Sequence, residues 1–281
     1  MTFTNYVLFQ HDLASHGIEY AAEHTLALGM DAVEFLAGVP SGLPAFNDLK
    51  EAEKTAEVLK RYGLKTSCFS VGASLYGPDM QKVEEGFKRY SEIAAILGSS
   101  YLHHTLFHPL VLPPNPPSYE TVFNAVIDSV ERVAAHAKQF GVSCLYEPQG
   151  MYFNGAGLKK LIDTFAKMGV ENVGVCADFG NSMFVDYAPC EIISEMMQYV
   201  CHVHIKDYKL CPDGEGDYRS SGGQCFYEVE YAKGDMKNRE CIKALLDAGY
   251  NGYFSTELNP RRVTADDAGV DALKRLRKDF L

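Results

Sequence analysis

Strand-like and helix-like stretches alternate eight times along this chain of 281 residues. Several helical stretches end at a glycine that is followed by a short apolar run, which is the usual helix-to-strand connection of a parallel α/β fold. Eight such units predict a (β/α)₈ barrel, a TIM barrel, with residues 1–281 in one domain. The expected strands are Tyr6–Phe9, Ala32–Phe35, Lys65–Phe69, Tyr101–His104, Ser143–Tyr146, Val173–Cys176, Cys201–Ile205 and Tyr253–Ser255. The clearest expected helices are Asp48–Tyr62, Met80–Leu97, Tyr119–Phe140 and Glu240–Ala248.

A doubly wound sheet is the alternative fold for an alternating chain. Such sheets usually have fewer strands and a glycine-rich first turn, and this sequence contains neither a G-x-G-x-x-G motif nor a P-loop. The barrel is therefore favoured. After the seventh strand we expect one long polar connection, Leu210–Met236, which serves either as a lid over the site or as surface decoration.

Composition argues against several classes of protein. No run approaches the roughly 20 apolar residues of a membrane span, and the first residues show no secretory signal. The net charge of −11 argues against a nucleic-acid partner. The eight cysteines are scattered without a Cys-x-x-Cys pair, so we interpret them as small, reduced core residues. These features predict a cytoplasmic protein with no membrane partner.

Four polar residues lie at, or one or two positions past, the ends of four of the expected strands: Glu147, Asp178, His204 and Glu257. In a barrel of parallel strands these ends converge on one open face. Three carboxylates and an imidazole brought together repel one another unless a cation lies between them. We therefore predict one divalent metal ion. Oxygen-rich ligands with a single histidine favour Mn²⁺ or Mg²⁺, with Co²⁺ and Zn²⁺ as alternatives.

The same residues suggest proton transfer. Removing a proton next to a carbonyl group needs a base near the carbon and a Lewis acid on the oxygen, and it produces an enediolate. Glu147 and Glu257 belong to strands five and eight, which lie far apart around a barrel, so these glutamates are expected to flank a ligand. We predict that they are the two catalytic residues, one acting on each face of the substrate.

Further polar residues are candidates for substrate binding. Lys206 either binds a substrate oxygen or pairs with Asp178 or Asp207. Strand alternation allows only one of His103 and His104 to point inward, and we choose His104 because it is nearer the strand end.

Deeper positions complete the candidate set. His202 lies two residues before His204 on the same strand face, so we expect a hydrogen-bonded core residue there. Asn181 and Asp207 follow the metal-ligand strands and are further candidates for substrate contact.

Four segments carry a resemblance to the xylose-isomerase-like TIM barrels, which include ketose 3-epimerases, hydroxypyruvate isomerases, inosose dehydratases and, more distantly, endonuclease IV. The segments are Leu145–Pro148, Cys176–Asn181, His202–Asp207 and Ser255–Pro260. The resemblance implies that Glu147, Asp178, His204 and Glu257 bind one divalent metal ion. It also implies that the two glutamates exchange protons with the substrate. Glu34 resembles a common glutamate of this superfamily, with a substrate contact and a structural salt bridge as its alternative roles.

Three positions depart from the ketose 3-epimerase pattern. Asn181 replaces a histidine, Leu210 an arginine and Phe153 a glutamate. The polar contacts to a free ketose are therefore not reproduced, and an inosose, a keto acid or a modified sugar is the expected kind of substrate. Asn181, the lack of histidine in Leu210–Met236 and the acidic charge also argue against a nuclease.

These features predict a metal-dependent isomerase or epimerase of a small sugar or related polyhydroxy carbonyl compound. A dehydratase of the inosose or dehydroshikimate type is the main alternative, because it begins with the same proton abstraction. A non-catalytic carbohydrate-binding barrel is a third reading, which intact Glu147 and Glu257 oppose. The expected partner is a small sugar or polyol-derived molecule, and a homo-oligomer stays open.

Overall fold

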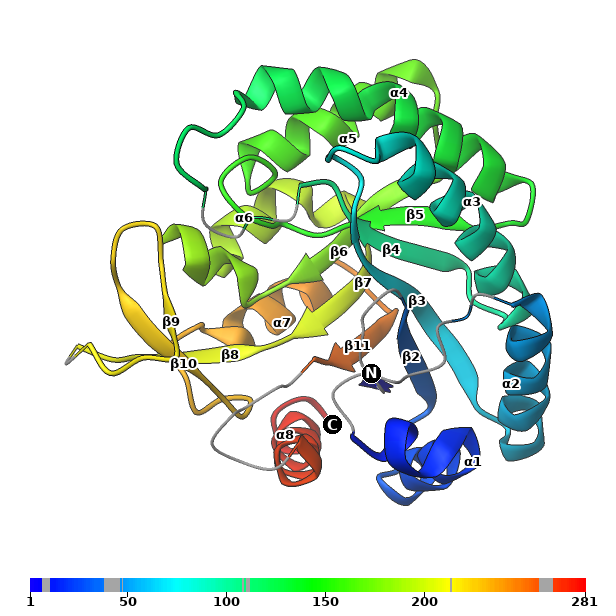
Figure 1. Ribbon diagram of the computed structural model, residues 1–281. Coiled ribbons are helices and arrows are strands. Elements are labelled where there is room, and N and C mark those ends of the chain that lie inside the picture. The colour runs from blue at the N-terminus through cyan, green and yellow to red at the C-terminus, as the bar shows by residue number, and fades with distance from the viewer. Residues whose placement is uncertain are drawn as a thin grey trace.

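Eight parallel strands close into a barrel that is enclosed by helices (Figure 1). The computed structural model describes residues 1–6, 11–37, 46, 48–107, 109, 112–212, 214–257 and 265–281. Around the barrel the strand order is β1-β11-β7-β6-β5-β4-β3-β2. The barrel strands are β1 (Thr2–Tyr6), β2 (Ala32–Ala37), β3 (Lys65–Ser74), β4 (Tyr101–Thr105), β5 (Ser143–Tyr146), β6 (Val173–Asp178), β7 (Val200–Ile205) and β11 (Tyr253–Thr256).

Helices follow the strands and cover the outside of the barrel. They are α1 (His11–Ala27), α2 (Leu49–Tyr62), α3 (Met80–Ile96), α4 (Tyr119–Lys138), α5 (Ala156–Met168), α6 (Pro189–Met196), α7 (Asn238–Asp247) and α8 (Ala265–Phe280), with short 3₁₀ helices at Asn181–Val185 and Met197–Tyr199. Local sequence sets several of their ends. Asp48 and Ser118 cap the first turns of α2 and α4, and Gly63 ends α2 in the left-handed conformation. Among the described residues, no helix is long and apolar enough to cross a bilayer.

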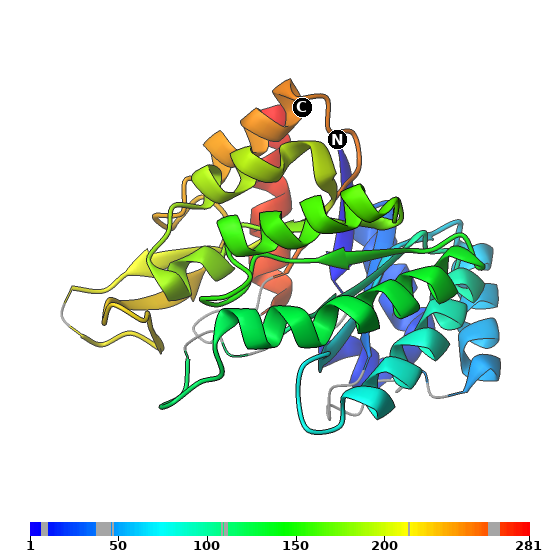
Figure 2. The same ribbon diagram turned by 90° about the horizontal axis from the view of Figure 1, so that it is seen from above.

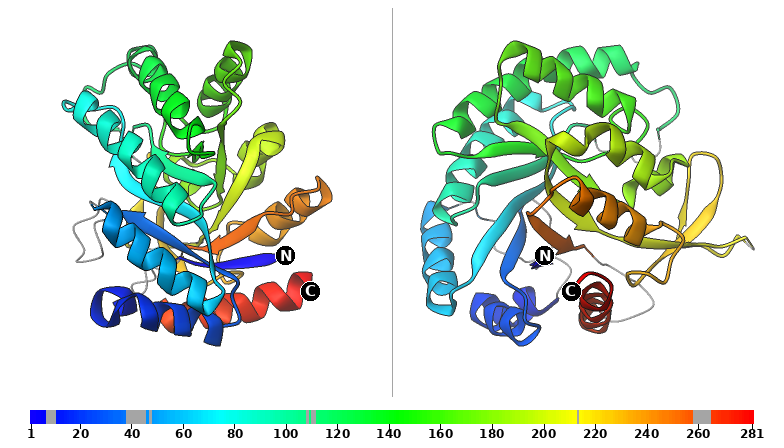
Figure 3. Two further views of the ribbon diagram at one scale, coloured as in Figure 1. Left: turned by 90° about the vertical axis from the view of Figure 1, so that its right-hand side faces the viewer. Right: turned by 180° about the vertical axis from the view of Figure 1, so that it is seen from behind.

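The apolar core lies between the barrel and its helices. One buried cluster joins β2–β6 to the helices around them, and includes Phe69, Phe87 and Val130. A second joins β1, β7 and β11 to α7 and α8. The two ends of the chain lie side by side, and α8 runs beside α1 (Figures 1 and 3), where Arg277 Nη2 donates a 2.6 Å hydrogen bond to the carbonyl oxygen of Gly29. This contact closes the helical layer where the barrel begins and ends.

The predicted barrel is confirmed, with two differences in its elements. The first strand spans Thr2–Tyr6, whereas most of the expected Tyr6–Phe9 lies outside the described residues. The long connection after β7 is also more ordered than its composition indicates. It forms an antiparallel sheet of β8 (Asp207–Leu210), β10 (Cys225–Val229) and β9 (Tyr218–Arg219), which projects to one side of the barrel (Figure 2). Phe226 of this sheet is fully buried against Tyr208 and Phe184, so a small aromatic core stabilises it.

The prediction that all cysteines are reduced core residues is wrong for two of them. Cys190 in α6 and Cys241 in α7 form a disulfide with their Cα atoms 5.1 Å apart. The two residues are 51 positions apart in the sequence, and only the packing of α6 against α7 brings them together. The other six cysteines are free, and four of them are buried. Cysteine usage therefore gives no support for a reducing compartment.

A buried carboxylate links α3 to α4. Glu84 accepts hydrogen bonds from Arg132 Nε at 2.9 Å and Arg132 Nη2 at 2.7 Å, and its Oε1 lies 3.0 Å from Lys88 Nζ. The hydrogen bonds from Arg132 lower the pKa of Glu84 to about 2, against the opposing effect of burial. Because the folded pKa is below that of the unfolded chain, ionised Glu84 stabilises the fold above roughly pH 5, and this stability is lost as the pH falls towards 2.

Glu84→Gln is therefore expected to reduce the free energy of unfolding by roughly 1–3 kcal/mol at pH 7, the range for hydrogen bonds to a charged group. Urea denaturation of both proteins at pH 7, 5 and 4 measures this, and the difference should narrow as the pH falls. Glu85→Gln is the matched control, since Glu85 is exposed and its carboxylate lies 2.9 Å from Lys88 Nζ at the surface. A constant difference across the pH range would contradict this assignment.

Candidate metal centre

The structure brings together Glu147, Asp178, His204 and Glu257, which we call the four-residue centre. Each residue lies at or directly after the end of its strand: β5, β6, β7 and β11. One ligand atom from each lies within 4.8 Å of all the others. Asp178 and His204 are neighbours in the register of β6 and β7, so the parallel pairing of the strands itself places them side by side.

One nitrogen of His204 faces the three carboxylates. Its Nδ1 lies 2.9 Å from Glu257 Oε2, 3.8 Å from Glu147 Oε2 and 3.9 Å from Asp178 Oδ2. All four side chains are buried or nearly so, with Glu257 the most exposed at 12%. Carboxylates this close together in a low-dielectric site need positive charge among them.

Glu34 contacts the other ring nitrogen of His204. Nε2 lies 2.9 Å from Glu34 Oε1, while Glu34 Oε2 lies 2.8 Å from Nε2 of His202. Ser70 Oγ donates a further hydrogen bond of 2.6 Å to Glu34 Oε1. A histidine whose second nitrogen is bound to a carboxylate has a fixed ring orientation, as is typical of metal-ligating histidines. His202 is thus the buried, hydrogen-bonded residue expected from its position.

Backbone donors orient Asp178. Its Oδ1 accepts hydrogen bonds from the N–H groups of Gly180 at 2.7 Å and Asn181 at 2.8 Å. These bonds turn Oδ2 towards the centre, where it lies near His204 and Lys206. The donor atom of Asp178 is therefore positioned before any ligand binds.

Lys206 supplies positive charge to the centre. Its Nζ lies 2.9 Å from both Asp178 Oδ2 and Glu257 Oε1, and it donates a 3.3 Å hydrogen bond to Asn181 Oδ1. Burial lowers the pKa of Lys206, but the charges of Asp178 and Glu257 outweigh it and hold that pKa well above its usual value. For Glu257 the effects have the opposite signs. Burial raises the pKa of Glu257, but the positive charges of Lys206 and His204 outweigh burial and lower that pKa below its usual value.

The residues of the four-residue centre fit a divalent cation. Three carboxylates and one imidazole form an oxygen-rich donor set of the kind that suits Mn²⁺ or Mg²⁺. The donor atoms are close enough to share one ion, and Glu34 and two backbone N–H groups orient two of them. Burial lowers the pKa of His204, but nearby groups, including Glu34 and Glu257, raise it well above its usual value, so metal binding there would compete with a proton.

The choice of His104 as the inward-facing histidine is wrong. The ring of His104 stacks on Phe87 of α3 at 3.8 Å and lies 3.3 Å from Tyr146 Oη, outside the barrel. Burial lowers the pKa of His104 to about 3. His103 faces the centre instead, with its Nε2 3.6 Å from Glu147 Oε2.

The strand register explains this error. β4 continues to Thr105, and His103 pairs in register with Ser70 of β3, which contacts Glu34 inside the barrel. Alternation along one strand shows that two neighbours point in opposite directions, but not which of them points inward. His103 is thus the site residue that sequence reasoning passed over, and the pairing of β4 with β3 is the signal that identifies it.

Asp207 does not reach the centre. Its carboxylate accepts hydrogen bonds from the backbone N–H groups of Gly234 at 3.0 Å and Met236 at 3.4 Å, so it fastens the end of the long connection to β8. Burial raises the pKa of Asp207. These hydrogen bonds favour a structural role for Asp207 over the predicted contact with substrate, since adjacent residues of an extended chain point to opposite sides.

The other candidates divide between the centre and its support. Asn181 is buried beside Lys206, at the edge of the four-residue centre. Glu34 has no exposed surface, and its hydrogen bonds favour the structural role over a substrate contact. Of the positions that depart from the ketose epimerase pattern, Phe153 is buried against Tyr119 and Leu210 is 39% exposed on β8.

The chain belongs to the xylose isomerase-like TIM barrel family, whose model matches residues 22–279. No curated protein sequence matches it. A xylose isomerase-like TIM barrel protein from Mycobacterium smegmatis, solved in complex with magnesium, is 18% identical with a TM-score of 0.73, over 99% of this chain and 95% of that one.

Two further solved structures are similar. D-allulose 3-epimerase from Methylomonas sp., in complex with D-allulose, is 16% identical with a TM-score of 0.74, over 99% of this chain and 97% of that one. A probable 3-DHS dehydratase from Bacillus anthracis is 15% identical with a TM-score of 0.70, over 99% of both chains. The structures that resemble this chain thus include an epimerase and a probable dehydratase, and at these identities the likeness shows the fold alone.

Lys206→Met is expected to destabilise the metal-free protein by about 3–5 kcal/mol, because it leaves two buried carboxylates without their cation. Added Mn²⁺ should restore more stability to this variant than it adds to the wild type. Thermal melts with and without Mn²⁺ measure both effects. Lys209→Met is the matched control, since Lys209 is 44% exposed and pairs with Asp235 at the surface. Equal melting temperatures and equal responses to Mn²⁺ would show that Lys206 does not balance the charge of the centre.

Proposed function

We propose that this protein is a metal-dependent isomerase or epimerase of a small sugar or related polyhydroxy carbonyl compound. The observation that carries the proposal is the position of two glutamates around one imidazole. Glu257 Oε2 and Glu147 Oε2 lie 2.9 Å and 3.8 Å from His204 Nδ1, and they come from strands that are not neighbours in the barrel. A ligand held between these glutamates would meet one carboxylate on each side.

The four-residue centre would hold the metal ion. Bound there, a divalent ion supplies a Lewis acid that polarises the substrate carbonyl. Glu257 is suited to be the first base because its lowered pKa keeps it ionised. It takes the proton from the carbon next to the carbonyl, and the electron pair of that C–H bond forms the enediolate. Glu147, on the other side of the ligand, would pass a proton from solvent to the opposite face.

Neighbouring side chains would position the substrate. The ammonium group of Lys206 and the amide of Asn181 lie at the edge of the centre, and His103 lies beside Glu147. Lys206 would stabilise negative charge that develops on a substrate oxygen. Glu34 would act through His204, by holding the orientation of its ring.

A dehydratase is the second candidate, and the charged Lys206 favours it. Elimination of water begins with the same proton abstraction, but then the bond from the neighbouring carbon to its hydroxyl breaks, a double bond forms and the leaving oxygen takes a proton. Lys206 is the ammonium group in the centre that would donate this proton to the leaving oxygen. The fold is shared with a probable dehydratase as well as with an epimerase.

Incubation of metal-loaded protein in deuterated water with ketoses, inososes and keto acids tests these proposals. NMR should show deuterium at the carbon next to the carbonyl group. An isomerase or epimerase gives a product of unchanged formula apart from the label, whereas a dehydratase gives an unsaturated product and water. A binding protein without catalysis gives no label with any substrate, and that result would refute both candidates.

Mn²⁺ and Mg²⁺ are expected to raise the melting temperature, because an ion that binds only the folded state stabilises it by about 2.7 kcal/mol at 100 times its Kd. His204→Ala should remove most of this shift. His136→Ala is the control and should keep it, because His136 lies in α4, 3.4 Å from Glu92 of α3. A wild-type protein whose melting temperature does not respond to Mn²⁺, Mg²⁺, Co²⁺ or Zn²⁺ would exclude the metal site.

Glu147→Gln and Glu257→Gln should each lower kcat by about 10²–10⁴-fold at saturating metal, the usual contribution of a general acid or base. Each variant should still exchange the substrate proton on the face served by the other glutamate, which deuterium labelling measures. Glu171→Gln, at an 85% exposed side chain, is the control. Full activity of both active-site variants would assign the proton transfers to other groups. Lys206 and His103 would then be the residues to test.

A further inference from the structure

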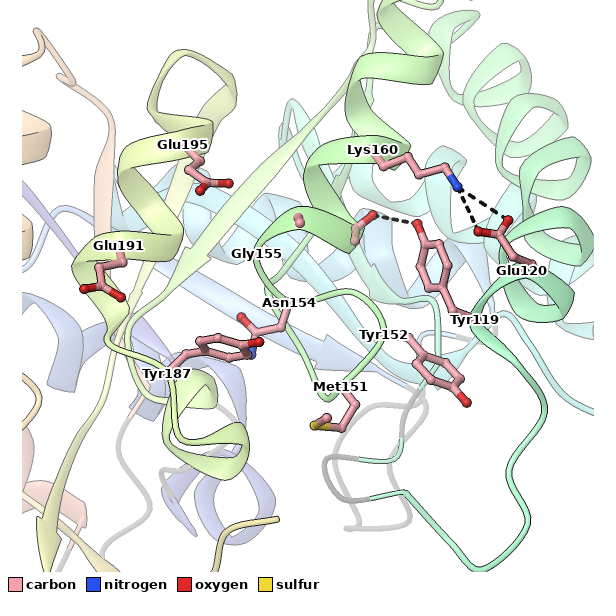
Figure 4. Close-up of a pocket in the computed structure, with 12 residues that line it drawn as sticks. Tyr119, Glu120, Met151, Tyr152, Asn154, Gly155, Lys160, Tyr187, Glu191 and Glu195 are labelled. Atoms are coloured by element: carbon pink, nitrogen blue, oxygen red, sulfur yellow. Dashed lines mark hydrogen bonds and ion pairs between the residues drawn. The ribbon is translucent and has the colours of Figure 1, made fainter. Parts of the chain in front are cut away.

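A pocket opens on the same face of the molecule as the four-residue centre. Its volume is about 590 Å³, within the range typical of small-molecule sites. The lining comes from the connections that follow β5 and β6, together with the first turns of α4, α5 and α6. Since β5 and β6 end at Glu147 and Asp178, the pocket is built by the loops that leave the centre (Figure 4).

Asn154 is the polar residue that most needs a ligand in this pocket. Only 6% of the residue is exposed. Neither its side-chain oxygen nor its side-chain nitrogen has a hydrogen-bond partner among the described residues. An unsatisfied buried amide is costly. The amide offers one acceptor and two donor hydrogens, which matches the paired hydroxyl groups of a sugar ring.

Aromatic side chains and a flexible apolar side chain also line this pocket. Tyr187 and Met151 are 54% and 44% exposed, and Tyr152 belongs to the same lining (Figure 4). Aromatic faces of this kind pack against the apolar C–H faces of carbohydrates, while the hydroxyl groups reach polar side chains. The mixture of rings and a planar amide therefore suits a saccharide better than a purely apolar ligand.

The charges in the pocket exclude an anionic ligand. Glu191 and Glu195 line one side, and on the other side Lys160 is paired with Glu120 at 3.1 Å (Figure 4). Lys160 also lies over the ring of Tyr119 at 5.1 Å. The cation is thus already engaged, and the surplus charge is negative. A phosphate or carboxylate group on the ligand would be repelled.

One glycine preserves the shape of the pocket. A Cβ atom at Gly157 would lie 1.8 Å from the carbonyl oxygen of Tyr152, so the loop presses directly on the first turn of α5. The carbonyl oxygen of Gly157 also accepts a 3.1 Å hydrogen bond from Tyr119 Oη. These contacts fix the wall that carries Asn154, which makes the pocket a formed feature of the fold.

We propose that this pocket binds a neutral sugar ring, and that it holds the second ring of a glycoside whose first ring reacts at the four-residue centre. The second part of this statement rests on the proposed function. The pocket then selects unphosphorylated substrates with two rings over free monosaccharides. This selectivity would come from Asn154 and Tyr187 and not from the metal ligands.

Binding to the full-length protein with Mg²⁺ tests the proposal. Saturation-transfer NMR with maltose, cellobiose, trehalose, glucose and glucose 6-phosphate reports affinity without any need for turnover. At least one disaccharide should bind about tenfold more tightly than glucose, and glucose 6-phosphate should bind no more tightly than glucose. Asn154→Ala and Tyr187→Ala should weaken disaccharide binding about tenfold, equivalent to about 1.4 kcal/mol, and weaken glucose binding less.

Two controls and a stability measurement separate binding from folding. Asn251→Ala and Tyr20→Ala change exposed residues away from the pocket and should alter no affinity. Asn154→Ala should keep or raise the melting temperature, because an unpaired buried amide contributes no hydrogen bond to stability. A marked fall in melting temperature would mean that Asn154 is structural, and would overturn the assignment.

The remaining outcomes distinguish the two proposals. The pocket assignment is wrong if no disaccharide binds more tightly than glucose, if glucose 6-phosphate binds most tightly, or if both pocket variants bind like the wild type. One further outcome is a protein that binds disaccharides through Asn154 and yet exchanges no substrate proton, whichever metal ion is added. That result would support the sugar pocket and refute the proposed catalytic function.

Discussion

The four-residue centre depends on the contact between the buried carboxylate of Glu34 and the ring of His204. This carboxylate lies between His202 and His204 without exposed surface and links β2 to β7 across the inside of the barrel. Burial raises the pKa of Glu34, but the two histidines lower it well below its usual value. A carboxylate that stays ionised keeps Nε2 of His204 engaged, so Nδ1 faces the three acidic side chains. The geometry of the centre follows from this one orientation.

Much of the fold and of this centre could be predicted from the sequence, because both depend on strand direction alone. Once eight strands run parallel, every residue at a C-terminal strand end lies on one face. Glu147, Asp178, His204 and Glu257 therefore had to approach one another, whatever the details of packing. The pairing of Lys206 with Asp178 follows in the same way, because Lys206 lies directly after β7 and the two strands are neighbours.

The features that sequence reasoning missed depend on how elements pack. Alternation separates His103 from His104, but only the register of β4 against β3 shows that His103 points inward. Asp207 looks like a site residue in the sequence, yet its partners are backbone groups in a distant part of the same connection. The disulfide joins helices whose contact no local pattern reveals. In each case the deciding partner is remote in sequence, and its position is set by tertiary structure.

Strands and loops carry different parts of the site, and this explains how the chain departs from the ketose 3-epimerase pattern. The ligands of the centre stand on strand ends, which the closed barrel holds rigid, whereas Phe153 has become part of the packed helical layer and Leu210 is an exposed apolar residue. Polar contact with a substrate must then come from elsewhere. We propose that the loops after β5 and β6 provide it through Asn154 and Tyr187, on a surface with surplus negative charge. Because the residues that orient His204 belong to strands, Glu34 to β2 and Ser70 to β3, changes at Asn154 and Tyr187 would alter which sugar binds while leaving the orientation of His204 intact.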